Sequence, residues 1–124
     1  MSKILMNMTV KSSNDIDELK GKEAIYLDDV ITYIDNGTNT TIKILDDEVI
    51  LARETDDTKV VLTFNKSAKK KSIYELKSHN LKMDILVDTK KLVIEDKKIN
   101  VIYDLYINDE LSDTFMYELE WSDL

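Results

Sequence analysis

Hydrophobic and polar residues alternate along most of the chain, in short segments rich in β-branched and aromatic side chains. In an extended strand every second side chain points to the same face, so this alternation predicts strands with one buried face. The first segment places Ile4, Met6, Met8 and Val10 on one face. The same pattern predicts strands at residues 24–27, 30–34, 40–45, 49–53, 60–64, 73–76, 81–87, 92–94, 99–107 and 115–121.

Polar clusters separate these segments and are predicted to be turns. The chain has two glycines and no proline, so its turns must use Asp and Asn, which tolerate left-handed backbone and bond their own backbone. Asp28-Asp29 and residues 46–48 are clear examples. Within the polar stretch 11–22, residues 15–20 are expected to form a helical turn.

The close spacing of the predicted strands favours an antiparallel arrangement, because no segment has the helix that a parallel crossover usually needs. About eight to ten consecutive strands form a meander, and closure into a barrel hides the edges of such a sheet. The sequence contains no internal repeat, linker or break in composition. We therefore predict an all-β fold, a single antiparallel barrel domain over residues 1–124.

Composition and charge exclude several kinds of chemistry. The 124 residues include no cysteine, which excludes disulfides, thiolate nucleophiles, cysteine-bound zinc and iron–sulfur clusters. The chain has one histidine, with no second one to share a metal, so we expect no metal site and no cofactor. The net charge of −8 argues against a general affinity for nucleic acid or anionic membranes. No apolar run reaches the length of a membrane helix, and a cytoplasmic protein is expected.

Several segments, spread over nearly the whole chain, carry a recognisable pattern. They are residues 37–44, residues 49–53, the strand around Phe64, Tyr74-Glu75, and residues 103–108. In order and spacing they resemble the small bacterial YwiB-like family of unknown function, whose members are similar in structure to calycins. The resemblance implies a lipocalin-like barrel, in agreement with the strand pattern. The chain departs from the family's pattern at Leu76 and His79, where a threonine and a glycine are expected. Because the family has no established activity, the resemblance implies a fold and no function.

Arg53 is the one arginine of the chain and the first candidate for a binding residue. If Asp46 and Asp47 form a two-residue loop, Thr40 lies opposite Arg53 on an otherwise apolar face. A guanidinium binds carboxylates and phosphates bidentately, so Arg53 and Thr40 would provide the polar contact for a ligand at the barrel mouth. Alternatively, Arg53 is structural and closes the barrel end by binding backbone carbonyls or an aspartate.

Aromatic residues are the candidates for the wall of a cavity. Tyr33, Tyr103 and Phe64 would line it, because their rings are apolar and tyrosine adds one polar tip. Tyrosine is also a good strand residue, which leaves a purely structural interpretation open. A barrel of about eight strands is either filled by its own side chains or holds one small ligand, and the sequence does not decide between these states.

No pattern in the sequence predicts catalytic residues. His79 lies in a polar turn, the paired acidic residues fall in turns, and the lysine-rich run 66–71 is typical of a solvated turn. We therefore expect a non-catalytic barrel that binds a small, partly apolar molecule. The alternative is a protein-interaction or structural module with a packed barrel, and an enzyme is the third hypothesis. No nucleic acid or membrane partner is expected, and the protein would be a monomer or a homodimer.

Overall fold

The computed structural model describes residues 2–124, which form ten β-strands and one turn of 3-10 helix, Lys77–His79. The strands are β1 (Ser2–Lys11), β2 (Ile16–Leu27), β3 (Val30–Asp35), β4 (Thr38–Ile44), β5 (Glu48–Glu54), β6 (Thr58–Asn65), β7 (Lys70–Leu76), β8 (Leu81–Glu95), β9 (Lys98–Ile107) and β10 (Glu110–Asp123).

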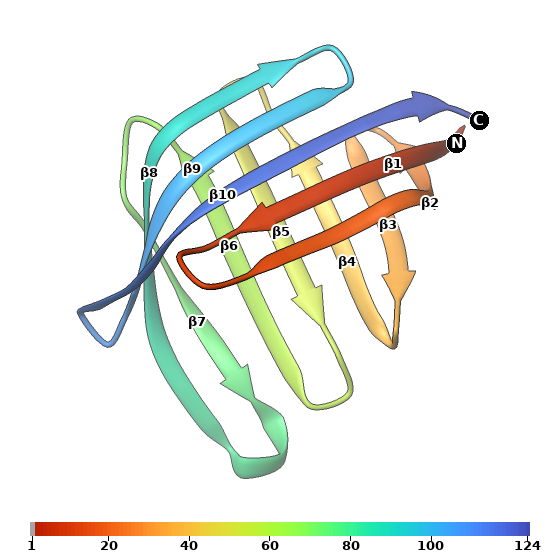
Figure 1. Ribbon diagram of the computed structural model, residues 1–124. Helices are drawn as coiled ribbons and strands as arrows, with labels where there is room; N and C mark the ends of the chain where they lie inside the picture. Colours follow the sequence, from red (N-terminus) through yellow and green to blue (C-terminus); the bar gives the residue numbers. More distant parts are fainter. Residues whose placement is uncertain (1) are drawn as a thin grey trace.

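The strands form an antiparallel meander that closes into a barrel (Figure 1). Each strand pairs with the next one in sequence, and β1 closes the sheet by pairing with β10. The two ends of the chain therefore lie side by side, with Ile4 opposite Asp123. Closure leaves the first and last strands without a free edge. The prediction of an all-β, antiparallel, closed barrel is confirmed.

Short hairpin turns depend on Asp and Asn, as the composition requires. In the β2–β3 turn Asp28 and Asp29 have φ angles of 50° and 64°, and in the β9–β10 turn Asn108 and Asp109 have 49° and 69°. Two successive residues with positive φ match the right-handed twist of the strands that they join, and Asp and Asn adopt this conformation more readily than most residues. The β3–β4 turn uses Asn36 in the same way, with Gly37 at 77°.

The prediction of a helical turn at residues 15–20 is wrong, because residues 16–20 belong to the first half of β2. It pairs with β1, with Val10 opposite Asp17 and Met8 opposite Leu19. A bulge follows at Gly21, whose φ of 62° suits glycine and whose amide donates to Asn7 Oδ1 at 2.8 Å. The alternation is weak in a strand that is largely exposed, so the local sequence does not reveal pairing with β1.

The segments 81–87 and 92–94 belong to one strand, β8, and not to two. A bulge between Thr89 and Lys91 adds one residue to β8 relative to β9. One extra residue reverses which positions face inward. The buried positions are accordingly odd-numbered up to Thr89, and Leu92 and Ile94 are the ones that pack against the core after it. The change of phase made one long strand resemble two short ones.

The inward side chains are closely packed at only one end of the barrel. At the end near the two chain termini, which we call the packed end, the core contains Ile4, Met6, Ile31, Ile42, Val49, Phe64, Ile99, Val101 and Leu119. Towards the opposite end, which we call the open end, inward residues such as Leu62, Leu105 and Phe115 are half-buried. The barrel is therefore filled in one half and hollow in the other.

Candidate ligand-binding site

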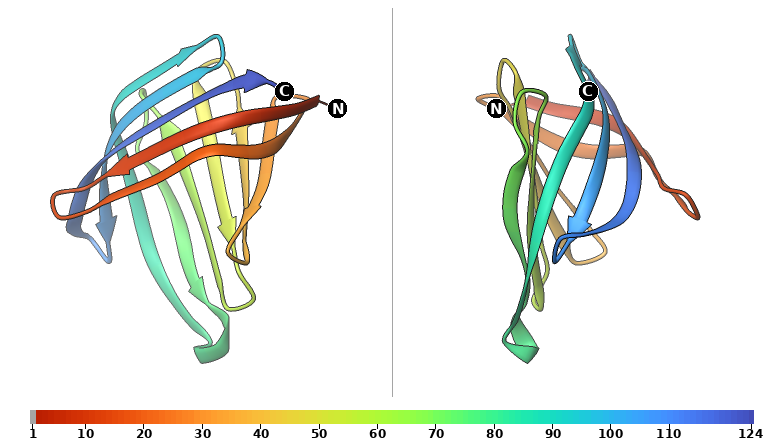
Figure 2. Two further views of the ribbon diagram at one scale, coloured as in Figure 1. Left: turned by 45° about the vertical axis from the view of Figure 1, so that its right-hand side comes forward. Right: turned by 90° about the vertical axis from the view of Figure 1, so that its left-hand side faces the viewer.

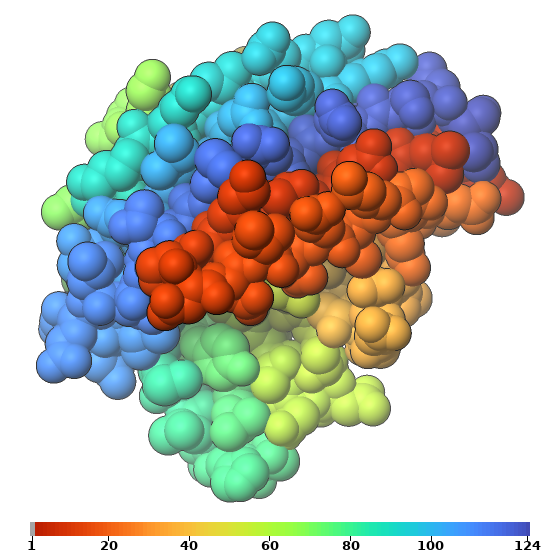
Figure 3. Space-filling view, viewed as in Figure 1, coloured from red at the N-terminus to blue at the C-terminus, as the bar shows by residue number. Residues whose placement is uncertain are grey.

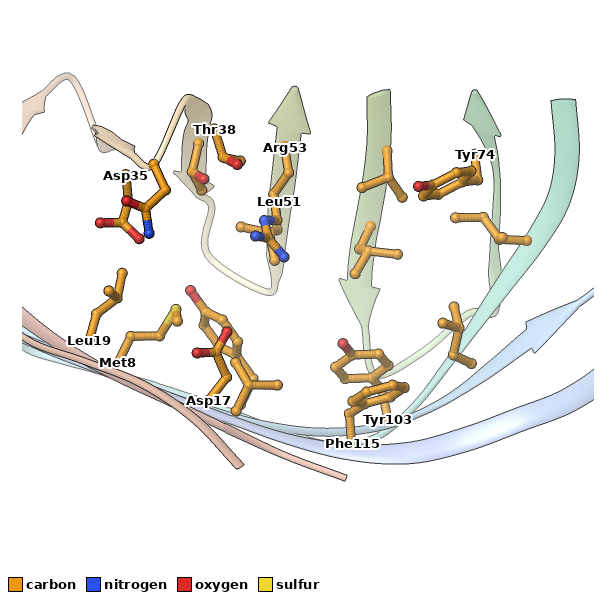
Figure 4. A pocket seen from close by; sticks show the side chains of 18 of the residues that line it. Met8, Asp17, Leu19, Asp35, Thr38, Leu51, Arg53, Tyr74, Tyr103 and Phe115 are labelled. Atoms are coloured by element: carbon orange, nitrogen blue, oxygen red, sulfur yellow. The ribbon is translucent and has the colours of Figure 1, made fainter. Parts of the chain in front are cut away.

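The hollow half of the barrel encloses a cavity of about 820 Å³. Every strand contributes to its wall, mostly with apolar side chains, and Figure 4 shows these converging from opposite sides. The lining residues are Met8, Val10, Asp17, Leu19, Tyr33, Asp35, Asn36, Thr38, Thr40, Leu51, Arg53, Val60, Leu62, Tyr74, Leu76, Met83, Ile85, Tyr103, Leu105, Ile107, Phe115 and Tyr117.

The cavity exists because neighbouring strands diverge at two places. β2 pairs with β3 only through residues 25–27, so its first half is free of β3, and β7 pairs with β6 only opposite Thr58 and Lys59. Figure 2 shows the β1–β2 hairpin pointing away from the ends of β3–β7. Figure 3 shows the same hairpin crossing the front of the molecule, with the surface falling back beneath it. Side chains from opposite walls therefore do not meet at the open end.

Arg53, near the carboxyl end of β5, projects into this cavity (Figure 4). The two-residue loop Asp46-Asp47 is present, since Leu45 N donates to Glu48 O at 2.8 Å, and Thr40 lies opposite Arg53 as predicted. Within residues 2–124 the guanidinium makes no hydrogen bond and no ion pair, and the side chain is exposed. The alternative interpretation of Arg53 as a cap of the barrel end has no contact to support it.

Tyr33 and Thr40 lie side by side on β3 and β4, below the mouth of the cavity. Thr40 is 1% exposed, and the Tyr33 hydroxyl donates to Met8 Sδ at 3.7 Å. Burial raises the pKa of Tyr33, while the Thr40 hydroxyl and the Arg53 guanidinium offset part of this rise. Thioether sulfur is a weak acceptor, so the Tyr33 hydroxyl is available to a better partner.

Tyr103 and Tyr117, on β9 and β10, form the floor between the hollow and packed halves. The Tyr103 ring stacks on Phe115 with centroids 5.3 Å apart. Burial raises the pKa of both tyrosines well above the ordinary value of 10.0, and Arg53 lowers each of them slightly in return. The Tyr117 hydroxyl is buried and has no hydrogen-bond partner in the part of the chain that the structure describes. Both phenols are thus neutral near pH 7, and one is an unused donor.

Two carboxylates stand at the mouth, and neither is paired with Arg53. Asp35 at the end of β3 forms an ion pair of 3.4 Å with Lys22 on β2. Asp17 projects into the cavity from the opposite wall to Arg53 (Figure 4). The mouth therefore holds the Arg53 guanidinium, the Asp35 carboxylate, which Lys22 neutralises, and the Asp17 carboxylate, which has no ion pair within residues 2–124.

Comparison with protein-family models matches residues 7–119 to a family described as a domain of unknown function, DUF1934. The chain belongs to this family. Among solved structures, this DUF1934 barrel is similar to the crystal structure of the ywiB protein from Bacillus subtilis, with a TM-score of 0.62 and 14% sequence identity. That match covers 97% of this chain and 90% of the other. No curated protein matches the chain significantly. The predicted resemblance to the YwiB-like family is confirmed, and at this identity the structural likeness shows the fold alone.

Most of the predicted site residues of this DUF1934 protein meet at the cavity. Arg53, Thr40, Tyr33 and Tyr103 all line it. Their placement follows from the alternation on the strands and from the β4–β5 register, both of which are local features of the sequence. Their part in binding stays a prediction.

The prediction that Phe64 lines the cavity is wrong. Phe64 is 0% exposed and lies beneath the floor, with its ring centroid 4.7 Å from that of Tyr103. The inward positions of β6 run from Val60 at the mouth through Leu62 to Phe64 in the packed half. The sequence shows that all three face inward but does not show how deep along the barrel each one lies.

Tyr117 is one of the six tyrosines that could line a pocket of this DUF1934 barrel, and it lines the cavity together with Tyr33 and Tyr103. Phe115, Tyr117 and Leu119 alternate along β10, and Phe115 pairs directly with Tyr103 of β9. The strand pattern therefore placed Tyr117 on the same face as a residue that had been singled out. What the sequence did not show is that its hydroxyl lacks a partner.

The other candidates examined in the sequence lie away from the cavity. His79 is exposed in the 3-10 turn beside Ser78, whose hydroxyl is 2.8 Å from His79 Nδ1, and Lys70 pairs with Glu48 at 3.7 Å. In the described part of this DUF1934 chain, His, Asp and Glu side chains nowhere gather in a group of three that could hold a metal. No helix among residues 2–124 has the length and hydropathy needed to cross a membrane.

Proposed function

We propose that this protein is a non-catalytic barrel that binds a small, partly apolar molecule in its hollow half. The observation that carries the proposal is the cavity of about 820 Å³, walled by apolar side chains and holding one unpaired guanidinium. Ligand sites are typically concave, of about 300–1,000 Å³, mostly apolar, and contain a few polar groups that orient the ligand. The finer assignment to the calycins, which the family resemblance suggests, fits this carrier role.

The competing hypotheses explain the interior less well. A structural or protein-interaction module with a packed barrel has no use for a hollow half, since empty apolar space forfeits packing energy. An enzyme needs an acid, base or nucleophile that converges with other groups at the reacting atoms. Here burial raises the pKa of the Tyr103 and Tyr117 phenols away from neutrality, and Asp35 is paired with Lys22. Asp17 also lines the cavity, but within residues 2–124 no hydrogen bond or ion pair joins it to Arg53 or to a phenol. A binding role requires only an apolar cavity with a few polar groups, and the hollow half has both.

The first test is native mass spectrometry of the freshly purified protein, repeated after denaturing extraction. We expect an added mass that disappears on denaturation. The variant Leu105→Trp would fill the cavity and abolish the added mass, because Leu105 lines the wall. The matched control is Tyr106→Trp, which enlarges the outer face of the same strand and should retain the added mass. Loss of the mass in both variants, or its absence in the wild-type protein from several growth conditions, would contradict the proposal.

A further inference from the structure

The polar groups of the cavity lie at two levels, one at the mouth and one on the floor. We propose that the ligand is a monoanion with an apolar body, whose carboxylate pairs with Arg53 and whose far end carries a group that hydrogen-bonds the Tyr117 hydroxyl. This inference rests on the proposed function and narrows it to one ligand class, a two-headed amphiphilic acid. Each of its three parts follows from a different observation.

The anionic head follows from the state of Arg53. A guanidinium with five donors makes no hydrogen bond and no ion pair within residues 2–124, although it projects into a largely apolar cavity. Carboxylates are the groups that its planar fork binds bidentately. Thr40 lies opposite Arg53 in the ladder, and the neighbouring Tyr33 hydroxyl donates to the thioether of Met8, which is a weak acceptor. Three side chains, Arg53, Thr40 and Tyr33, can therefore donate hydrogen bonds to one anionic group.

A single negative charge fits the mouth better than two. Asp17 and Asp35 line the same cavity, and Lys22 is already engaged by Asp35 at 3.4 Å. A phosphate dianion at Arg53 would meet one uncompensated carboxylate, Asp17, and a protein of net charge −8. Each further negative charge on the ligand adds to this repulsion, so a ligand with one negative charge is favoured over a ligand with two. A cation is disfavoured for a different reason, because Arg53 would repel it inside the cavity.

The second polar group follows from Tyr117. Tyr117 is 3% exposed and contributes to the cavity lining, and its buried hydroxyl has no hydrogen-bond partner within residues 2–124. An unpaired buried hydroxyl is unfavourable, because the group has lost its hydrogen bonds to water and gained none in the protein. Burial also raises the pKa of Tyr117, which keeps the phenol protonated and able to donate. A ligand atom that accepts this hydrogen bond recovers an interaction that the empty barrel lacks.

The apolar body follows from the rest of the cavity wall. Leu51, Leu62, Leu105 and Phe115 line the same cavity and carry no polar side-chain atom. A methylene chain or a ring buried against them favours binding, because it removes apolar surface from water. Polar groups in the middle of the ligand would lose their hydration without gaining partners.

The test is calorimetric titration of the full-length protein with four probes of one chain length. Decanoate carries the anionic head alone, 10-hydroxydecanoate carries both heads, 1-decanol carries no charge, and decyltrimethylammonium carries the opposite charge. We expect decanoate to bind about 10-fold or more tightly than 1-decanol, because hydrogen bonds to charged groups are the stronger ones. We expect 10-hydroxydecanoate to exceed decanoate by about 3-fold or more.

Two variants assign these differences to their residues. Arg53→Met keeps the apolar stem and should cancel the advantage of decanoate over 1-decanol, whereas Lys59→Met, which removes a positive charge from exposed Lys59 on β6, should leave it unchanged. Tyr117→Phe should cancel the advantage of 10-hydroxydecanoate over decanoate. Because it deletes an unpaired hydroxyl, Tyr117→Phe should also fold at least as stably as the wild type.

The outcomes separate this inference from the proposed function. If 1-decanol or decyltrimethylammonium binds as tightly as decanoate, the anionic head is wrong while the binding barrel stands. If Tyr117→Phe leaves the preference for 10-hydroxydecanoate intact, the second head is wrong. If none of the four probes binds the wild-type protein and no added mass is found in native spectra, the proposed function itself fails.

Discussion

At the scale of single residues, the tyrosines of the cavity floor link burial to ionisation. Burial raises the pKa of Tyr33, Tyr103 and Tyr117, because the phenolate would have to lie among apolar side chains. The Arg53 guanidinium lowers each of these pKa values, but by less than burial raises it. The floor therefore stays uncharged, which suits contact with an apolar ligand.

This ionisation predicts a loss of stability in alkaline solution. The unfolded chain releases its tyrosine protons near the ordinary value of 10.0, whereas the folded barrel holds those of Tyr103 and Tyr117 to higher pH. The free energy of unfolding should be unaffected by these groups below about pH 10, and should fall as the pH rises above it. Urea unfolding between about pH 8 and pH 11 should show a shallower fall for Tyr103→Phe. Tyr106→Phe, an outward tyrosine of the same strand, should retain the wild-type slope; equal slopes in both variants would contradict the argument.

At the scale of elements, the sequence predicts strands better than it predicts where they part. Alternation identified the inward face of nearly every strand, and the Asp46-Asp47 loop fixed the β4–β5 register that brings Thr40 opposite Arg53. Alternation failed at residues 15–20, where the strand is largely exposed, and at Lys90, where a bulge reverses the phase. Both failures depend on how a strand pairs with its neighbour, and this pairing is not visible in the local sequence.

Because β6 and β7 diverge, the barrel wall should lack backbone hydrogen bonds between them beyond Lys59, and we call this region the seam. Thr55 N donates to Thr58 O, so Thr58 faces β5, and alternate residues from Lys59 onward face β7. Lys59 has Glu75 as a partner, but β7 supplies none for Val61 and Thr63. Their amides should exchange with deuterium much faster than the amide of Val101, whose strand pairs on both sides. Similar protection of all three amides, measured by NMR in the native state, would show that the seam is closed in solution.

At the scale of the whole molecule, the division into packed and hollow halves could not be predicted. The positions of Val60, Leu62 and Phe64 look equivalent in sequence, yet they run from the mouth to the core. Depth along a barrel depends on strand tilt and on closure between β1 and β10, which are separated by most of the chain. The family resemblance predicted the fold but gave no information on the cavity.

The hollow half should make this barrel less stable than it could be, and the position of Leu62 tests this. Leu62→Phe adds volume where the wall faces the cavity, so it should stabilise the fold by about 0.5–2 kcal/mol while it removes the added mass seen in native spectra. Phe64→Ala, two residues deeper on the same face, should instead cost about 3–5 kcal/mol, because it empties the packed half. Urea unfolding measures both changes. If Leu62→Phe gains stability and loses binding, the empty space is maintained for a ligand at a cost in folding energy. If Leu62→Phe loses stability, the hollow half is already packed in solution.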